Sequence, residues 1–199
     1  MRAFREHTGI VAPLDRSSVD TDQIIPKQFL KRIERTGYGE FLFYDWRYSS
    51  EGKPRAEFVL NQPQFSEASI LVAGKNFGCG SSREHAAWAL ADYGFRVVIA
   101  PTFADIFNTN AGNNGILLVR LSENDVAGLI QRAQHSTGYT LHVSLVDKTV
   151  RDDAGFRAGF EIDDFRRTCL LEGLDEIGLT LQHDAEISAY ESKVAKRGW

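Results

Sequence analysis

Cysteine is scarce in this sequence, and its scarcity limits the metal and disulfide chemistry open to the chain. The 199 residues contain two cysteines, Cys79 and Cys169, and the first residues, MRAFREHTG, lack the apolar stretch of an export signal. We therefore expect no disulfide framework. A cubane iron–sulfur cluster typically requires four thiolates, so two cysteines do not supply its ligands. The histidines are scattered without an H-x3-H or H-E-x-x-H spacing, which predicts no metal site built by this chain alone.

Long apolar runs and an excess of positive charge are also missing. No stretch approaches the ~18 apolar residues that a membrane-spanning helix needs. The formal net charge of -4 does not suit a nucleic-acid partner, because phosphate binding favours a basic surface. We expect neither a membrane nor a nucleic acid as partner, and a cytoplasmic location. What is present, 43% hydrophobic and 25% charged residues, is typical of a single globular domain with a substantial core.

Hydrophobic patterning predicts alternating strands and helices, most clearly from residue 69 onward. Short apolar runs bounded by turn residues are typical of buried strands, and longer segments with helical spacing separate them. The predicted strands are 7–14, 69–73, 96–101, 116–121 and 139–147, and the predicted helices are 81–94, 102–110, 122–134, 160–174 and 184–197. Strands separated by helices predict an α/β fold with parallel pairing. The helix 122–134 is expected to open with a Ser-x-x-Asp cap.

The segments between the first and second predicted strands are less regular. Residues 24–39 are expected to form a turn and a short helix that ends at glycine. FLFYDWRY, residues 41–48, is aromatic and favours a strand. Residues 49–65 are rich in turn formers and are expected on the surface.

The last quarter of the chain is expected to be an extension of the core. We divide the chain into an α/β core, 1–150, and a largely helical C-terminal extension, 151–199. In the last predicted helix, Ile187, Tyr190 and Val194 recur at helical spacing and form one apolar face. We therefore expect this helix to pack on the domain.

The chemically informative stretch is GKNFGCGSSREH, residues 74–85, between a predicted strand and a predicted helix. Its three glycines allow a tight bend and let a ligand approach the backbone. The start of the following helix offers free N–H groups and a partial positive charge, which together favour an anion. We expect Arg83 in the first helical turn, where acidic residues are usual, so a cation there indicates that an anion binds between them.

Structural alternatives exist for the same residues. Ser81-x-x-Glu84 is also a capping-box pattern, in which the serine would cap the helix. Cys79 is a possible nucleophile, because a position before a helix lowers the pKa of a thiol. Alternatively, Cys79 is a small buried residue with a structural role. The glycines match neither G-x-x-x-x-G-K-[ST] nor G-x-G-x-x-G, so no nucleotide-binding motif is present.

GKNFGCGSSREHAAWAL closely resembles the active-site signature of the small subunits of bacterial 3-isopropylmalate dehydratases, and more loosely that of the swivelling domain of aconitase. Further segments resemble the same family in the same order, so the resemblance covers nearly the whole chain: VDTDQIIPKQFLKR, LFYDWRY, ADIFNTNAGNNGILLV and FEIDDFRRTCLLEGLDEIGLTLQH. It implies one swivelling β/β/α domain over residues 1–199, with a C-terminal helical tail.

The resemblance also implies an activity and a partner. Enzymes of this family interconvert 2-isopropylmalate and 3-isopropylmalate through isopropylmaleate, by anti elimination and re-addition of water, in leucine biosynthesis. The implied [4Fe–4S] cluster belongs to the large subunit, so this chain would bind no cofactor and would be inactive alone. Residues 41–48 are a candidate contact with that subunit. A related citraconate, methylmalate or homoaconitate-type hydratase, or a non-catalytic anion-binding module, remain alternatives.

Residue roles are carried over position by position. Ser81 matches the catalytic base, while Arg83 and Ser82 are expected to bind a substrate carboxylate. Asp22 matches an active-site aspartate that orients the arginines or the base, although an Asx-turn before Pro26 is an alternative on pattern alone. The substrate-recognition loop is implied to include Leu30, Lys31 and Arg32, with Leu30 as the candidate contact to the isopropyl group.

Overall fold

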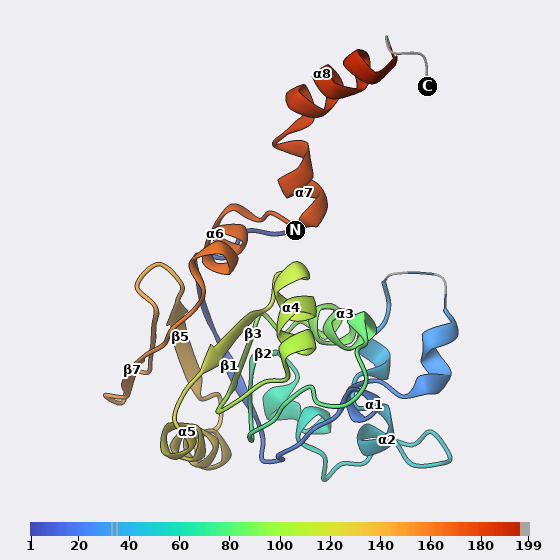
Figure 1. The fold of residues 1–199 in the computed structure, drawn as a ribbon. Coiled ribbons are helices and arrows are strands. Elements are labelled where there is room, and N and C mark those ends of the chain that lie inside the picture. Colours follow the sequence, from blue (N-terminus) through green and yellow to red (C-terminus); the bar gives the residue numbers. More distant parts are fainter. Residues whose placement is uncertain (33, 35, 196–199) are drawn as a thin grey trace.

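The described residues form one mixed seven-stranded sheet in the computed structural model (Figure 1), with strand order β4-β3-β2-β1-β5-β6-β7. The structure describes residues 1–32, 34 and 36–195. The strands are β1 (Glu6–Leu14), β2 (Ala68–Ala73), β3 (Val97–Ala100), β4 (Leu117–Arg120), β5 (Thr140–Ser144), β6 (Thr149–Arg151) and β7 (Arg157–Gly159). The first four pair in parallel, as the alternating pattern predicts, whereas β5, β6 and β7 add to β1 in antiparallel order.

Helices cover both faces of the parallel part of the sheet, with α3 and α4 on one side and α5 on the other (Figure 1). The helices are α1 (Thr21–Ile24), α2 (Tyr44–Arg47), α3 (Glu84–Tyr93), α4 (Asp105–Asn113), α5 (Glu123–His135), α6 (Asp164–Glu172), α7 (Glu176–Leu181) and α8 (Asp184–Ala195). Short 3-10 helices occur at Lys27–Lys31, Gly39–Phe41, Val59–Asn61 and Pro63–Phe65.

The strand sequences explain why both faces are covered. Successive strand residues point to opposite faces, so in β2 Leu71 joins the core beneath α3 while Ile70 and Val72 join the core beneath α5. A strand that is apolar at every position can be stable only when both faces are buried. The predicted cap of α5 is confirmed, since the Ser122 side chain accepts a hydrogen bond from the Asp125 amide at 3.1 Å.

The strand preference of residues 41–48 is wrong. This segment contains the end of a 3-10 helix and the helix α2, with Phe43 at φ +50° between them. Leu42 and Phe43 are completely buried, and the Phe43 ring stacks on Trp46 at 5.4 Å. Aromatic side chains favour strands chiefly because strands bury them, and here a compact helical turn buries them equally well. Residues 49–65 also contribute more to the core than expected, through Phe58, Leu60 and Phe65.

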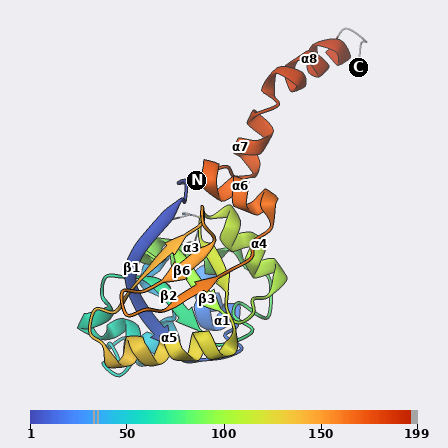
Figure 2. The same ribbon diagram turned by 90° about the vertical axis from the view of Figure 1, so that its left-hand side faces the viewer.

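The tail departs from expectation in two ways. The strand pair β6–β7 was not predicted, and the division at residue 150 falls inside β6. The expected packing of the last helix on the domain is wrong, because α7 and α8 run away from the sheet in two perpendicular views (Figure 2). Ile187 and Tyr190 remain 38% and 69% exposed. None of the helices in the described ranges has the length and apolar character needed to span a bilayer.

Candidate active site

The candidate site lies where the loops after β1 and β2 meet. Because these parallel neighbours end at the same edge of the sheet, the segments that follow them come together there, as is usual for sites in open α/β sheets. The Gly78 amide donates to the Val19 carbonyl at 2.8 Å, and the Thr21 amide donates to the Cys79 carbonyl at 3.0 Å. The loop carrying the serines is thus fastened to the start of α1, which lies about sixty positions earlier in the sequence.

Two glycines shape this loop as the sequence predicts. Gly78 and Gly80 have φ values of +76° and +85°, a backbone conformation that other residues rarely adopt. A side chain at Gly78 would also overlap the Phe107 ring, which lies on α4. The loop therefore packs closely against α4 and bends back toward α1.

The capping-box interpretation of Ser81 is wrong. The helix α3 begins at Glu84, with Arg83 at the N-cap in extended conformation and no side chain capping it. Arg83 is consequently not in the first helical turn. Ser81 is exposed, and its hydroxyl makes no hydrogen bond to any residue that the structure describes. The uncapped start of α3 leaves backbone N–H donors available, and it leaves the Ser81 hydroxyl free for chemistry.

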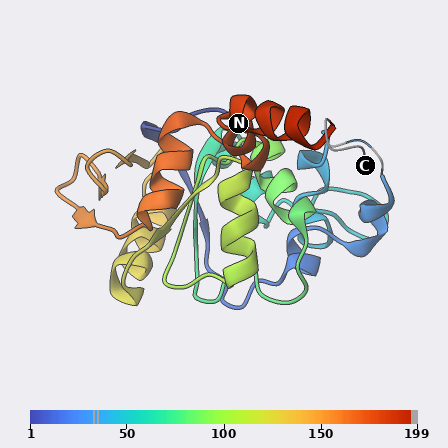
Figure 3. The same ribbon diagram turned by 45° about the horizontal axis from the view of Figure 1, so that its top comes forward.

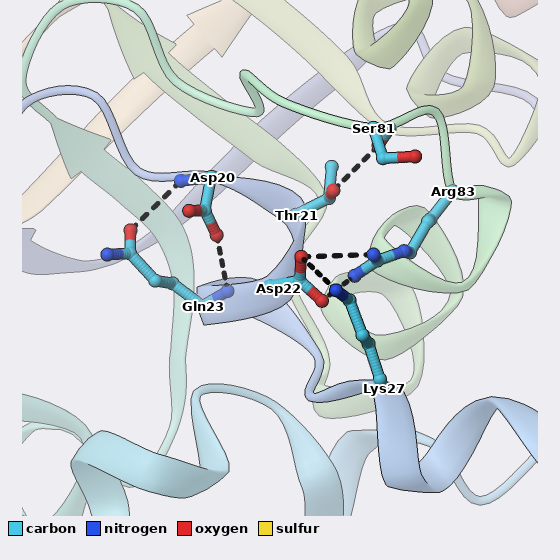
Figure 4. A network of polar contacts seen from close by, with 7 residues as sticks. All are labelled: Asp20, Thr21, Asp22, Gln23, Lys27, Ser81 and Arg83. Atoms are coloured by element: carbon cyan, nitrogen blue, oxygen red, sulfur yellow. Dashed lines mark hydrogen bonds and ion pairs between the residues drawn. The ribbon is translucent and has the colours of Figure 1, made fainter.

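Arg83 and Asp22 form the principal ion pair of the site (Figure 4). The two terminal nitrogens of the guanidinium donate to the two carboxylate oxygens, with Nη2 to Oδ2 at 3.0 Å. The Arg83 side chain is only 10% exposed, and Lys27 Nζ lies 3.7 Å from the same carboxylate. The hydrogen bond from Arg83 lowers the pKa of Asp22, so this carboxylate is ionised at neutral pH. The Asx-turn alternative for Asp22 is wrong, because its carboxylate binds Arg83.

Arg83 therefore already uses its planar fork within the chain. We expected that fork to bind a substrate carboxylate, yet in the structure both terminal nitrogens face Asp22. Each of these nitrogens carries a second N–H, so Arg83 retains donors for an anion while Asp22 fixes the plane of the guanidinium.

A pocket of about 260 Å³ opens beside these groups. It is lined by Thr21, Gly78, Gly80, Ser81, Ser82, Arg83, Ala104, Asp105, Ile106 and Phe107. Sequence reasoning did not anticipate the wall formed by the start of α4, where Ile106 is 55% exposed. The pocket combines an exposed hydroxyl, a cation and helix-start N–H groups with an apolar wall, and these features suit a small carboxylate ligand with an apolar part.

The predicted recognition-loop residues do not line this pocket. Leu30 is half-buried against the core, and Lys31 is exposed at the end of a 3-10 helix. Arg32 is held by its own segment, with Glu40 at 3.3 Å and its guanidinium over the Phe41 ring at 5.1 Å. Their contact with substrate stays a prediction.

Cys79 has the properties of a structural thiol. Burial, reinforced by the negative charge of Asp20, raises the pKa of Cys79, which opposes the lowering expected from its place before a helix. The thiol is therefore protonated at neutral pH and is a poor nucleophile. Within the described ranges, no group of three or more histidine, cysteine or acidic side chains is arranged to hold a metal ion. The donors of this chain do not fit an iron–sulfur cluster.

Sequence reasoning missed Thr21, although this residue directly precedes Asp22. Thr21 is 2% exposed, and its hydroxyl donates to the Ser81 carbonyl at 2.7 Å (Figure 4). Together with its amide bond to Cys79, this hydroxyl ties the serine loop to α1.

We expect Thr21→Val to lower the free energy of unfolding by about 1–2 kcal/mol, because a nearly isosteric change leaves the Ser81 carbonyl without its donor. Urea unfolding followed by circular dichroism measures this loss. Thr21→Ser should restore most of it. Thr109→Val is the matched control, since the exposed Thr109 bonds only within α4 and should change stability by less than about 0.5 kcal/mol. An equal loss of stability in Thr21→Val and Thr109→Val would contradict the proposed role of the Thr21 hydroxyl in holding the serine loop.

Comparison with known proteins identifies the family to which this sequence is similar. The model for the aconitase C-terminal domain matches residues 1–124, one described as LeuD_N matches 127–164, and that for the C-terminal domain of the 3-isopropylmalate dehydratase small subunit matches 176–197. Small subunits of 3-isopropylmalate dehydratase from Acidobacterium capsulatum and Brevibacillus brevis are 61% and 58% identical. These alignments cover 100% and 97% of this chain, and 94% and 100% of the relatives.

A solved structure is similar in fold. The crystal structure of a 3-isopropylmalate dehydratase (leuD) from Methanocaldococcus jannaschii superposes with a TM-score of 0.67 at 24% identity, over 93% of this chain and 99% of that one. The swivelling-domain fold is thereby confirmed. Given the full-length relatives and the family matches, this chain belongs to the family of 3-isopropylmalate dehydratase small subunits.

Proposed function

We propose that this chain, together with a large subunit, forms a hydro-lyase that interconverts 2-isopropylmalate and 3-isopropylmalate through isopropylmaleate in leucine biosynthesis. The observation that carries the proposal is that the free Ser81 hydroxyl and Arg83, the N-cap residue of the uncapped helix α3, line one pocket. Family membership supplies the substrate class. A cytoplasmic location belongs to the same proposal.

Ser81 is the proposed base. In each elimination its oxygen takes the proton from the substrate carbon next to a carboxylate, the C–H electrons form the double bond, and the hydroxyl departs from the neighbouring carbon. Re-addition of water with the opposite regiochemistry reverses these events and gives the other isomer. A serine alkoxide requires strong stabilisation, which the N–H groups at the start of α3 and the nearby guanidinium can provide.

Arg83 and Ser82 are the proposed anchors for a substrate carboxylate. Asp22 accepts from both terminal nitrogens and so holds the guanidinium in one plane, which leaves the second N–H of each nitrogen for a substrate carboxylate. Leu30, Lys31 and Arg32 stay proposed recognition residues. When the carboxylate is anchored, the carbon that loses its proton lies beside the Ser81 oxygen. The binding contact therefore also aligns the substrate for proton transfer.

The stereochemistry of the reaction indicates where a large subunit would lie relative to the substrate. In an anti elimination the base and the leaving hydroxyl lie on opposite faces of the substrate, so a chain that supplies the base meets the partner across the substrate. We assign the [4Fe–4S] cluster to the large subunit, where it would supply Lewis-acid binding of the hydroxyl. Residues 41–48 stay a proposed contact, although Leu42 and Phe43 are buried within this chain and are unavailable for it.

The test is reconstitution with the large subunit of the same organism. We expect the pair, but neither chain alone, to form isopropylmaleate from both isomers, which ultraviolet absorbance of the double bond detects. Citraconate and homoaconitate serve as competing substrates in the same assay. Faster turnover of either one would replace the proposed substrate, and an inactive pair with an intact cluster would refute the hydro-lyase proposal.

A further inference from the structure

The segment from Glu176 to Ala195, which we name the C-terminal arm, comprises α7 and α8 and extends away from the domain in two perpendicular views (Figures 1 and 2). In Figure 3, where the top of the molecule comes forward, the arm is foreshortened and projects over the upper edge of the domain. Its base is nevertheless fixed. The N-terminal ammonium donates to the Gly173 carbonyl at 3.0 Å and lies 3.5 Å from the Asp175 carboxylate. Asn113, at the end of α4, donates to Glu176 at 3.0 Å. The arm therefore leaves the domain from a defined anchor.

Both helices of the arm carry apolar stripes that this chain does not cover. On α7, Ile177 and Leu181 are four residues apart and are 69% and 62% exposed. On α8, Ile187 and Tyr190 are three residues apart and are 38% and 69% exposed. Spacings of three and four place such residues on one helix face, and a stripe of this kind is normally buried.

The exposed apolar side chains concentrate in this part of the molecule. In the described ranges, seven large hydrophobic residues are exposed, and five of them lie between positions 165 and 190. The five are Phe165, Ile177, Leu181, Ile187 and Tyr190. Phe165 lies on α6, and the other four lie on the arm. Scattered exposed residues need no explanation, but four along one projecting element mark an interaction surface.

The helix α8 also lacks support of its own. It has 12 residues, and an isolated helix of that length is marginal in water. Between residues 184 and 195 the structure contains no hydrogen bond or ion pair to another element; Glu186 bonds only to His183, directly before the helix. Packing against another molecule would supply the missing stabilisation.

The family relationships indicate which molecule packs against the arm. The match to the aconitase C-terminal domain ends at residue 124, whereas the match over 176–197 is named for the small subunit of 3-isopropylmalate dehydratase. The arm is thus characteristic of chains that are separate subunits and must hold their partner without a covalent link. Its anchor, α4, also joins it to the pocket, because Asn113 binds the arm while Asp105 and Ile106 line the pocket.

We infer that the C-terminal arm is a docking element that places its two apolar stripes, Ile177 and Leu181 on α7 and Ile187 and Tyr190 on α8, in an apolar groove of the large subunit. This inference rests on the proposed function for the identity of the partner. At about 1.5 Å per residue, α8 alone spans about 18 Å of such a groove.

The test compares the affinity of full-length variants for the large subunit by calorimetry. The arm variant combines Ile187→Glu with Tyr190→Lys, which leaves net charge unchanged and uses good helix formers. We expect its Kd to rise at least about 30-fold, as for the loss of an interface hot spot, while the Tm of the isolated chain stays the same. Val146→Lys is the control, since Val146 is 46% exposed outside the arm, and its Kd should not change.

Wild-type affinity in the arm variant would overturn the inference. So would a loss of self-association in the variant with unchanged binding to the large subunit, because the occupant would then be a second copy of this chain. Turnover separates this inference from the proposed function. We expect the arm variant to recover wild-type kcat at saturating large subunit. A wild-type pair that binds through the arm but converts no isopropylmalate would refute the proposed function alone.

Discussion

Ser81→Ala is expected to reduce kcat of the assembled enzyme by about 10³-fold or more, because the substrate proton loses its acceptor. General-base catalysis typically contributes about 10²–10⁴-fold. The neighbouring Ser82 also lines the pocket, but its proposed role is to bind the substrate carboxylate. Asp105 also lines the pocket, but it belongs to the first turn of α4 and not to the serine loop. Steady-state rates on both isopropylmalate isomers with saturating large subunit measure the loss.

The stability of the fold should not change in the Ser81→Ala variant. The Ser81 side chain neither caps α3 nor bonds to any described residue, so its removal should alter the free energy of unfolding by less than about 0.5 kcal/mol. Ser122→Ala gives the opposite result and is the matched control. It removes a cap that the structure contains, so it should cost about 1 kcal/mol and leave turnover intact. Near wild-type activity in assembled Ser81→Ala would remove Ser81 from the proposed mechanism.

The sequence predicts the core of this molecule well because the core depends on short-range patterning. The runs at 69–73, 96–101 and 116–121 are apolar at nearly every position, which only a strand covered on both faces can accommodate. The family resemblance, which rests on sequence alone, implies that Ser81, Arg83 and Asp22 belong to one site. In the structure, residues from these two distant segments do lie together.

The start of α3 could not be predicted, because a distant segment decides it. The pattern Ser81-x-x-Glu84 is indistinguishable locally from a capping box. Tertiary contacts decide where the helix begins. Thr21 binds the Ser81 carbonyl and Asp22 binds the Arg83 guanidinium, and the chain is not helical directly before Glu84. Local propensity favours a helix that begins three residues earlier, and the contacts to α1 keep these residues accessible to a ligand.

The tail illustrates a different limit of sequence reasoning. Periodicity in Ile187, Tyr190 and Val194 correctly predicts a helix with one apolar face. Periodicity does not indicate which molecule covers that face. An apolar stripe that packs against another subunit has the same spacing as one that packs against the core of its own domain. The recognition loop has a related limit, because the contacts of Arg32 with Glu40 and Phe41 depend on neighbours in space.

Arg83→Lys is expected to lower kcat/KM of the assembled enzyme by about 10²-fold or more, with changes in both kcat and KM. A lysine ammonium is a point charge that cannot bond both oxygens of Asp22 and still present a fixed N–H direction to the substrate. Because one anchor both binds the carboxylate and aligns the acidic carbon with Ser81, binding and turnover fall together. Asp22→Asn should produce a similar but smaller loss, since the guanidinium remains but its plane is no longer fixed.

The stability of the Arg83 variant distinguishes this role from a structural one. Arg83 lies outside the first turn of α3, so its removal does not relieve the helix dipole as the sequence alone suggests. Asp22 is 40% exposed, and solvent screening limits the loss of the pair to about 1 kcal/mol or less. Arg132→Lys is the matched control, because Arg132 pairs with Asp152 far from the pocket lining and should leave both kcat and KM unchanged. Unchanged kinetic parameters in Arg83→Lys would move the substrate site away from the start of α3, because no fixed guanidinium would then be needed to hold the carboxylate beside Ser81.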